Sequence, residues 1–428
     1  MATTQLSRRL AGIVLAVTVC AAAAPAAAQT AAVTQCETCH RGQADARLST
    51  PARDFALTDV HRERGFSCVN CHGGNASEPD QIKAKAPSTG FKGKPAGQAV
   101  IAVCAQCHSD ATLMRKFAPK QRIDQAAEYA TSVHGQQLAK GDTRVATCAS
   151  CHGAHGVRLV GDAQSPVYVR NVATTCSRCH SDPARMSGYT LPDGSPLPTD
   201  QHAKYTRSVH HAAMVKGNDL SAPTCNDCHG NHGAAPPGVG AIANVCGTCH
   251  TVFATKFALS AHSQIFDRSC VECHSNHEIA KPSDEMLGTD KAAVCVTCHG
   301  DGDNGFKAAA AMRGQIEQLK AAISHSESVV AEAENAGMAM GSQSIALREA
   351  SNRLTLARTE LHAFDPKPVE AVLQEGLAIT AKIDAEGAAA LAEMSYRRTG
   401  LAVSLAAILL VVVALRLKIR SLPYPPDR

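Results

Sequence analysis

The stretch SVHGQQLAKGDTRVATCASCHGAHG, residues 132–156, contains both elements from which most of this chain is built. One element is the pentapeptide Cys-x-x-Cys-His, here Cys148 to His152, and the other is the pair of flanking histidines, His134 and His155. Two thiols one helical turn apart can form thioether bonds to the edge of a porphyrin, and the adjoining histidine can then bind its iron. The stretch therefore predicts a covalently attached c-type haem.

The pentapeptide occurs nine times, and every Cys-x-x-Cys in the chain is followed directly by histidine. Together the nine motifs use 18 of the 19 cysteines. A zinc ribbon would not require that histidine each time, and a disulfide framework would not place half of its cysteines before histidine. We therefore expect nine covalent haem c groups. The predicted sites are Cys36/Cys39/His40, Cys68/Cys71/His72, Cys104/Cys107/His108, Cys148/Cys151/His152, Cys176/Cys179/His180, Cys225/Cys228/His229, Cys246/Cys249/His250, Cys270/Cys273/His274 and Cys295/Cys298/His299.

A longer repeat surrounds four of the motifs and supplies additional histidines. It runs from an aromatic residue through a leading histidine and a gap to Cys-x-x-Cys-His, and it ends in a trailing histidine three residues later. Three copies are complete, whereas Asn75 stands in the trailing position of the first copy. A spare imidazole is what the second axial position of a low-spin, bis-histidine iron requires. The sixth ligands expected from the repeat are His61, His134, His155, His210, His232, His262 and His277.

Nine haems need nine sixth ligands, which is two more than the seven histidines of the repeat. His202 and His211 lie in the same region and could complete the number, although neither has a counterpart in the other copies. Alternatively, one or two irons stay five-coordinate or bind methionine. His325 and His362 fall in the C-terminal helical segment, where we expect ordinary solvent-facing side chains.

The two ends of the chain predict export and membrane attachment. Residues 1–28 have the basic, apolar and small-residue segments of a cleaved signal peptide. Residues 397–420 are predicted to form a membrane anchor, because the apolar stretch from Gly400 to Leu415, extended by Leu417 and Ile419, comes close to the ~20 residues that a span needs. Because basic residues favour the cytoplasmic side, residues 421–428 are expected to be a cytoplasmic tail. These features predict a chain anchored in membrane lipid on the periplasmic side of the bacterial inner membrane.

Between these ends, the sequence divides into two parts of different composition. Residues 29–303 hold all nine motifs and are predicted to form short helices and loops around stacked haems, with internal two-haem repeats. In residues 304–396, apolar side chains recur every three or four positions, from Met312 to Ala333 and from Leu347 to Phe364. This spacing predicts a helical hairpin or bundle, and homo-oligomer formation through it is the alternative. The expected fold is mainly α with extensive loops, ending in one transmembrane helix.

Composition limits both the partners and the kind of core. The formal charge is only +4, which gives no reason to expect nucleic-acid binding. Aromatic residues make up 4% of the chain and tryptophan is absent, too little for an ordinary core of this length. We expect the porphyrins themselves to fill the interior.

The Ser-Val-His…Cys-x-x-Cys-His-Gly-x-His-Gly pattern within residues 36–299 resembles the doubled-CxxCH family of periplasmic multihaem c-type cytochromes. The resemblance implies that neighbouring haems relay single electrons. It also implies that the leading and trailing histidines of the three complete copies are distal ligands. The helical segment followed by an anchor is similar, more loosely, to hydroxylamine oxidoreductase relatives.

Two functions are compatible with these features. The first is electron transfer, as in anaerobic respiration, from a membrane quinol-oxidising protein or cytochrome b-type subunit to periplasmic or outer-membrane redox proteins. The second is a multihaem oxidoreductase, with one open haem acting on a compound such as nitrite, hydroxylamine or tetrathionate. The chain has no Cys-x-x-Cys-Lys motif, and its spare histidines nearly fill the ligand demand. We therefore favour the electron carrier and assign no catalytic residue.

Overall fold

The computed structural model describes residues 32–238 and 241–422, so the predicted signal peptide and residues 423–428 lie outside the described chain. The described residues form many short helices joined by loops, and one isolated antiparallel β-bridge joins Thr190 to Pro196. The mainly α fold expected from the sequence is confirmed. The chain divides into two compact units, one up to His202 with Ala213–Ala235, the other Ala203–Ala212 with the residues from Pro236 onward.

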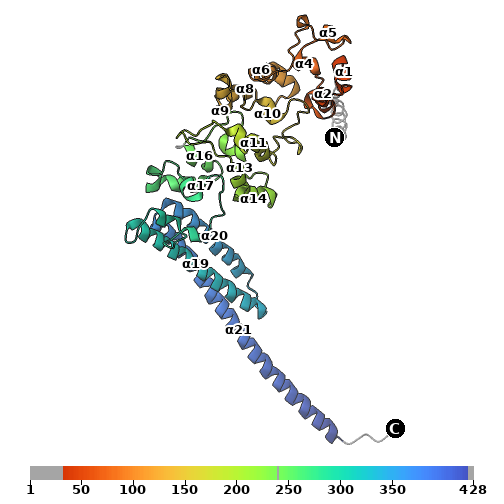
Figure 1. Ribbon diagram of the computed structural model, residues 1–428. Coiled ribbons are helices and arrows are strands. Elements are labelled where there is room, and N and C mark those ends of the chain that lie inside the picture. Colours follow the sequence, from red (N-terminus) through yellow and green to blue (C-terminus); the bar gives the residue numbers. More distant parts are fainter. Residues whose placement is uncertain (1–31, 239–240, 423–428) are drawn as a thin grey trace, which may run out of the picture. The chain divides into compact units, whose positions relative to one another are not determined.

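The first unit consists of short helices and long loops (Figure 1). Its helices are α1 (Gln35–Arg41), α2 (Ala46–Thr58), α3 (Val60–Glu63), α4 (Cys68–His72), α5 (Gln81–Ala84), η1 (Pro87–Thr89), α6 (Gln98–His108), α7 (Ala111–Phe117), α8 (Gln125–Thr131), α9 (Val133–Ala139), α10 (Cys148–His152), α11 (Val172–His180), α12 (Pro183–Met186) and α15 (Cys225–His229). Two further helices, α13 (Gln201–Thr206) and α14 (Val209–Val215), cross the division between the units.

The second unit combines short helices with three long ones. Its helices are α16 (Ile242–Gly247), α17 (Thr251–Ala258), η3 (Ala261–Gln264), α18 (Val271–His274), η4 (Asp284–Met286), η5 (Val294–Thr297), α19 (Asn304–Asn335), α20 (Gly341–Glu360), η6 (Leu361–Ala363) and α21 (Pro366–Ser421). The unit therefore contains the last three haem motifs as well as the helical segment. The domain boundaries expected from composition stay a prediction.

Three of the four motifs inside the longer repeat are one-turn helices, because the sequence supplies both helix ends. In α10, Thr147 is the N-cap, and Ser150 between the two cysteines completes a capping box. Gly153 then takes φ +83° and ends the helix directly after His152. Equivalent boxes join Ser67 to Asn70 in α4 and Thr224 to Asp227 in α15. Each helix holds its two thiols one turn apart and presents the histidine at its end.

The fourth copy lacks this glycine. Ser275 follows His274 with φ +65° and ψ −177°, in a backbone region that glycine occupies in the other three copies. A side chain in that region is unfavourable, so the last doubled motif is held by its surroundings as well as by its own sequence.

Successive copies of the repeat interlock through the backbone. In each case the residue before a leading histidine donates its amide to the carbonyl two residues after the trailing histidine of the next copy. These bonds are Val60 to Val157 at 2.8 Å, Val133 to Ala234 at 3.0 Å and Val209 to Ile279 at 2.8 Å. The leading segment of one copy is thereby fastened to the trailing segment of the next.

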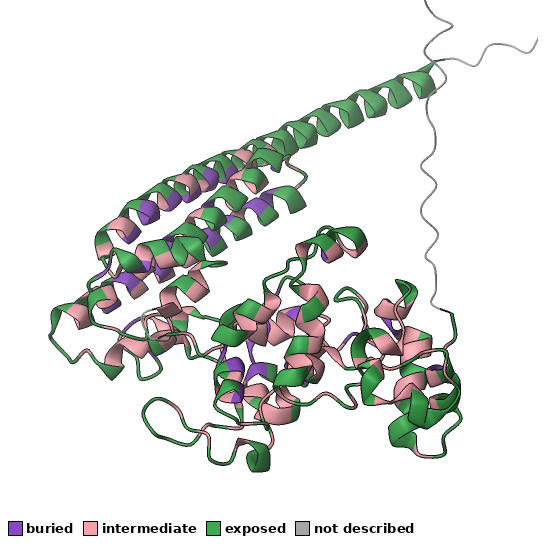
Figure 2. Ribbon diagram, turned by 90° about the horizontal axis from the view of Figure 1, so that it is seen from above, coloured by how far each residue is buried: buried purple, intermediate pink, exposed green. Residues whose placement is uncertain are grey.

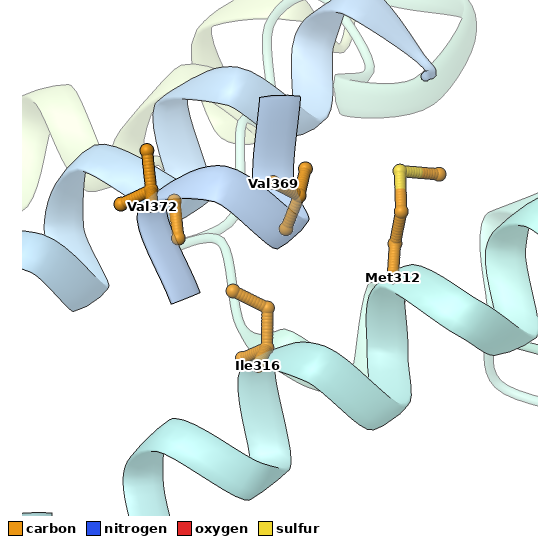
Figure 3. Close-up of a cluster of buried hydrophobic side chains, with 5 residues drawn as sticks. Met312, Ile316, Val369 and Val372 are labelled. Carbon is orange, nitrogen blue, oxygen red and sulfur yellow. The ribbon is translucent and has the colours of Figure 1, made fainter. Parts of the chain in front are cut away.

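Helices α19, α20 and α21 lie side by side as a three-helix bundle (Figure 1). Met312 and Ile316 of α19 pack against Val369 and Val372 of α21, as Figure 3 shows. Gly376 permits the close approach of these helices, since a Cβ atom there would lie 2.7 Å from a methyl carbon of Leu319. The apolar seam is therefore covered within one chain.

Helix α21 continues without a break from the bundle through Ser421 and is 56 residues long. Beyond the bundle it is exposed on all sides (Figure 2). Among the described residues, it is the one helix long and apolar enough to cross a membrane, and none of its most apolar window is buried. The apolar C-terminal helix expected from the sequence is confirmed.

Ion pairs join the last haem motifs to the bundle. Asp284 lies 2.8 Å from an Arg358 nitrogen and 3.0 Å from Lys320 Nζ, and only 14% of its side chain is exposed. Lys256 of α17 contacts Glu360 at 2.8 Å, at the end of α20. These pairs hold one end of the bundle against the haem-motif region of the same unit.

Candidate functional site

Seven histidines of the Cys-x-x-Cys-His motifs, termed proximal from here on, each face a second imidazole. The pairs involve helices that are far apart in sequence but belong to the same unit. Their ring centres are separated by 6.1 Å in His61–His108, 5.9 Å in His72–His155, 6.1 Å in His134–His180, 6.1 Å in His152–His232, 6.2 Å in His210–His250, 5.9 Å in His262–His299 and 6.2 Å in His274–His362.

These separations fit an iron between each pair. Iron–nitrogen bonds of about 2 Å on both sides put the ring centres of two axial imidazoles roughly 6 Å apart. The angle between the two ring planes varies from 4° to 90°, which is compatible with axial ligation because each ring can rotate about its bond to the metal. The residues present therefore fit bis-histidine haem iron.

The pairs follow a register that the sequence alone did not reveal. In four of them a leading histidine faces the proximal histidine of the next motif outside the repeat, as His134 faces His180. In two others a trailing histidine faces the proximal histidine of the preceding copy, as His155 faces His72 and His232 faces His152. The second and third copies therefore each lend both of their spare histidines to motifs outside themselves.

Hydrogen bonds at Nδ1 orient several of these rings. His72 Nδ1 lies 2.8 Å from the Gly93 carbonyl oxygen, and His362 Nδ1 lies 3.3 Å from the Thr359 carbonyl oxygen. A carbonyl only accepts, so Nδ1 carries the proton in both rings and the Nε2 lone pair remains available to a metal. His61 Nδ1 contacts the Asp59 carboxylate at 2.9 Å, which makes that imidazole a stronger ligand.

Burial also keeps most of these imidazoles in the form that binds metal. It lowers the pKa of the rings below the ordinary value of histidine, so the neutral form with a free lone pair dominates at neutral pH. Burial is the largest cause of the lowered pKa at His108, His134, His152, His155, His180, His210, His232, His262, His274 and His362.

The cysteines show which motifs are neighbours, and their thiols stand for the thioether sulfurs of a haem-loaded chain. Thiols of consecutive motifs are hydrogen-bonded in three places. The pairs are Cys104 with Cys148, Cys176 with Cys225 and Cys246 with Cys270. In each pair the hydrogen bond lowers the pKa of the second thiol to about 7. The first cysteine of a motif outside the repeat thus meets the first cysteine of the next motif.

The second cysteines make the alternate links. Desolvation is the largest cause that raises the pKa of Cys71, Cys151 and Cys273. A negatively charged thiolate of the next motif raises these pKa values further, since Cys107 acts on Cys71, Cys179 on Cys151 and Cys295 on Cys273. Desolvation likewise raises the pKa of Cys68, and the Cys36 thiol adds to this. The six motifs of the first unit therefore follow one another in chain order, and within the second unit the three remaining motifs do the same.

The second cysteine is exposed to solvent in five of the nine motifs, whereas the first cysteine is half-buried in every motif. The exposed side chains are Cys39, Cys71, Cys228, Cys249 and Cys298. Attachment does not require a buried thiol, since the thioether forms at the edge of the porphyrin. These five cysteines stay predicted attachment sites, and an interior filled by the porphyrins stays a prediction as well.

A cavity of about 260 Å³ beside Cys179 suits the anionic edge of a haem. Arg144, Arg178 and Arg185 line it together with this cysteine. The two propionates of a haem are carboxylates, and guanidinium groups bind carboxylates through charge-assisted hydrogen bonds. Because the propionates lie on the porphyrin edge opposite the thioether bonds, these arginines suit the propionates of a neighbouring haem rather than those of the haem attached at Cys179.

Two of the expected ligands are not brought to a proximal histidine among the described residues. The His211 ring packs on Tyr205, with ring centres 5.4 Å apart, and His202 makes no ring contact. His277 lies in the second unit and His229 in the first. The Nδ1 atom of His229 is 3.3 Å from the Ala235 carbonyl oxygen. The assignment of His202 and His211 as ligands therefore gains no support from their positions.

The expectation for the helical segment was half right. His325 is indeed solvent-facing, with 65% of its side chain exposed. His362 is not, because η6 turns it toward the last haem motifs, where it faces His274. Helical spacing could not reveal this, since His362 leaves the α20 helix just where the chain turns. A clue was the sequence His362-Ala363-Phe364, which matches the trailing histidine and the apolar residue two positions after it in the repeat.

Every histidine of the chain lies within the described residues, and no imidazole ring contacts the His40 ring. In the register above, a motif outside the repeat is faced by the leading histidine of the copy before it, and His40 is the first histidine of the sequence. The trailing position of the first copy is Asn75, whose side chain accepts a 3.0 Å hydrogen bond from the Ser77 amide. The ligand set of the first motif therefore differs from that of the seven paired motifs.

Residues 262–304 match a family model described as the doubled CXXCH motif. The matched segment contains the leading histidine His262 and the motifs that begin at Cys270 and Cys295. The match supports a multihaem c-type cytochrome with covalently bound haem c, as the sequence predicted. No curated protein and no solved structure matches the chain. The looser similarity to hydroxylamine oxidoreductase relatives is not supported.

Proposed function

We propose, on the premise that this chain is a multihaem c-type cytochrome, that it carries single electrons along nine haems, which follow chain order within each of the two units. The contact between cysteines of consecutive motifs carries this proposal. A thioether sulfur lies on the porphyrin edge, so neighbouring sulfurs bring the edges of consecutive haems together. Electron tunnelling slows steeply with the distance between edges, and such a row therefore conducts.

The paired imidazoles support transfer rather than catalysis. An iron bound by histidine on both faces has no open coordination position, so it exchanges electrons without binding a substrate. Seven motifs have such a pair. Most of the row is thus suited to a carrier.

Helix α21 suits an anchor that holds the haems of the second unit away from the bilayer on the periplasmic side. From Pro366 to Arg397 it rises about 47 Å, at 1.5 Å per residue, before its apolar stretch begins. A tilt of 40° leaves roughly 36 Å between the η6 turn and the membrane surface. A quinol-oxidising protein or cytochrome b-type subunit that donates electrons to the haem at Cys270 would therefore itself project from the membrane. Periplasmic or outer-membrane redox proteins would take them onward.

A second candidate is an oxidoreductase in which one haem binds a small nitrogen or sulfur compound. The observation that favours it is that no second imidazole of the described residues contacts the His40 ring. An iron bound by His40 alone would keep one face for nitrite or hydroxylamine. If so, the first haem is the reaction site and the other eight supply its electrons.

Haem analysis of the full chain in detergent tests the first proposal. Pyridine haemochrome per protein should give about nine haems, and rapid mixing with a soluble reductant should reduce all of them in one connected process. A value near four, or groups of haems that never equilibrate, would contradict the row. Adding nitrite or hydroxylamine distinguishes the two candidate functions. A high-spin ferric signal that shifts on addition, together with consumption of the added compound, would favour the enzyme.

A further inference from the structure

The turn between α20 and α21 places a histidine at a haem motif outside the helical bundle. The His362 ring lies 6.2 Å from the ring of His274, centre to centre, and the two planes differ by 17°. This separation and this angle fall within the ranges found for the pairs formed by the repeat histidines. The His362 side chain is only partly exposed, in contrast to His325 of the same bundle.

The turn also has the sequence and the neighbours of a trailing segment. Trailing histidines are followed two residues later by an apolar residue, as His155 by Val157 and His232 by Ala234. His362 is followed in the same way by Phe364, whose φ of +54° turns the chain. That residue meets the leading histidine of the last copy, because the Phe364 and His262 ring centres are 4.2 Å apart.

Several contacts hold this turn in position. The Phe253 ring of α17 packs edge-on against His362, with ring centres 4.9 Å apart. The ion pair between Lys256 and Glu360, two residues before His362, fastens the same helix to the turn. The 3.3 Å contact of His362 Nδ1 with the Thr359 carbonyl oxygen leaves Nε2 as the nitrogen available to a metal.

We propose that the turn at residues 361–364 replaces the trailing segment of a fifth copy, and that His362 Nε2 is the sixth ligand of the iron whose haem is attached at Cys270 and Cys273. The proposal rests on haem binding at that motif. The repeat register leaves His274 without a partner, because no fifth copy follows. The helical bundle supplies the ligand instead and closes the C-terminal end of the array.

The experiment compares the full-length wild type with His362→Ala, and with His325→Ala as the matched control on the exposed face of the bundle. The haem content is measured first, because a missing haem at Cys270 would defeat the proposed function and not this assignment. With haem retained, His362→Ala should turn one low-spin iron high-spin in low-temperature EPR. The reduced protein should bind one additional equivalent of carbon monoxide, and free imidazole should reverse both changes. His325→Ala should match the wild type.

A second variant keeps the test decisive if His362→Ala fails to fold. His362→Met retains a ligand of similar size, and histidine–methionine coordination should raise the potential of one haem and change its ferric spectrum. Full haem content with unchanged spin state and carbon monoxide binding in His362→Ala, or an unchanged spectrum in His362→Met, would overturn the proposal.

Discussion

The two ends of the repeat array differ in whether a second imidazole faces the proximal histidine there. At the N-terminal end, no imidazole of the described residues contacts the His40 ring. At the C-terminal end, where the repeats stop, the helical bundle brings His362 against His274. Repeat proteins need specialised terminal units because the last repeat lacks a neighbour. Here one end has such a unit and the other does not, so the ends should differ in ligand binding.

The largest effect is expected from removing a haem within the row rather than at its end. Replacing both Cys270 and Cys273 by alanine should lower the haem content by one and slow electron passage from the Cys246 motif to the Cys295 motif by at least about tenfold. The matched pair, Cys36→Ala with Cys39→Ala, should also lose one haem but leave the remaining row connected. Stopped-flow reduction followed at haem wavelengths distinguishes the two. Equal rates in both variants would argue against chain order.

The next effect concerns the open end. Wild-type protein should bind carbon monoxide at the iron of the first haem, because no second imidazole contacts His40. Replacing both Cys36 and Cys39 by alanine should remove that haem and lower carbon monoxide binding by about one equivalent. The variant with Cys270 and Cys273 replaced by alanine is the control and should lose a haem without losing carbon monoxide binding. Equal carbon monoxide binding in wild type and the Cys36/Cys39 variant would show that the first iron already has a sixth ligand.

A smaller effect is expected at the closed end from the ion pairs of Asp284. The hydrogen bond from Arg358 is the largest cause that lowers its pKa, and Lys320 lowers it further. A carboxylate with a depressed pKa stabilises the fold above its ordinary pKa, and this contribution disappears as the pH falls below about 4. Asp284→Asn should therefore lower the free energy of unfolding by about 1–2 kcal/mol at pH 7, discounted for the exposure of Arg358.

Thermal or denaturant unfolding as a function of pH, from pH 7 downward, measures this contribution. The difference between wild type and Asp284→Asn should shrink as the pH falls below about 4 and through the depressed pKa of Asp284, because the carboxylate then becomes protonated. Glu375→Gln, in an exposed ion pair with Arg353, is the control and should change little. A difference that stays constant with pH would show that packing rather than charge is responsible.

The smallest effect is a gain in stability at the last doubled motif. Ser275→Gly should raise the free energy of unfolding by about 1 kcal/mol, because glycine adopts φ +65° without steric cost. The reciprocal change, Gly153→Ser, should cost a similar amount, since a Cβ there meets only the His155 carbonyl oxygen at 3.7 Å. Denaturant midpoints of the two variants should therefore move in opposite directions. A loss of stability in Ser275→Gly would show that its side chain makes a compensating contact.

The sequence predicted the haem motifs, the spare histidines and the long helices, since each depends on local spacing. Thiols one helical turn apart, a capping residue before the first cysteine and a glycine after the histidine act within a few residues. The apolar seam from Met312 to Ala333 likewise follows helical periodicity, and its core residues are buried as expected. The prediction that His362 faces solvent was wrong because its surroundings are not local. They come from α17 and α18, which are distant from His362 in the sequence.

By itself, then, the sequence determined that this chain carries many covalent haems, is mainly helical and ends in an apolar helix. Only the tertiary structure decided which imidazole faces which iron site. The reason is that axial ligands are shared between copies, so each pair joins residues dozens of positions apart and depends on how the copies interlock. The same holds for the closed end, where a turn far along the chain takes the place of a repeat that the sequence lacks.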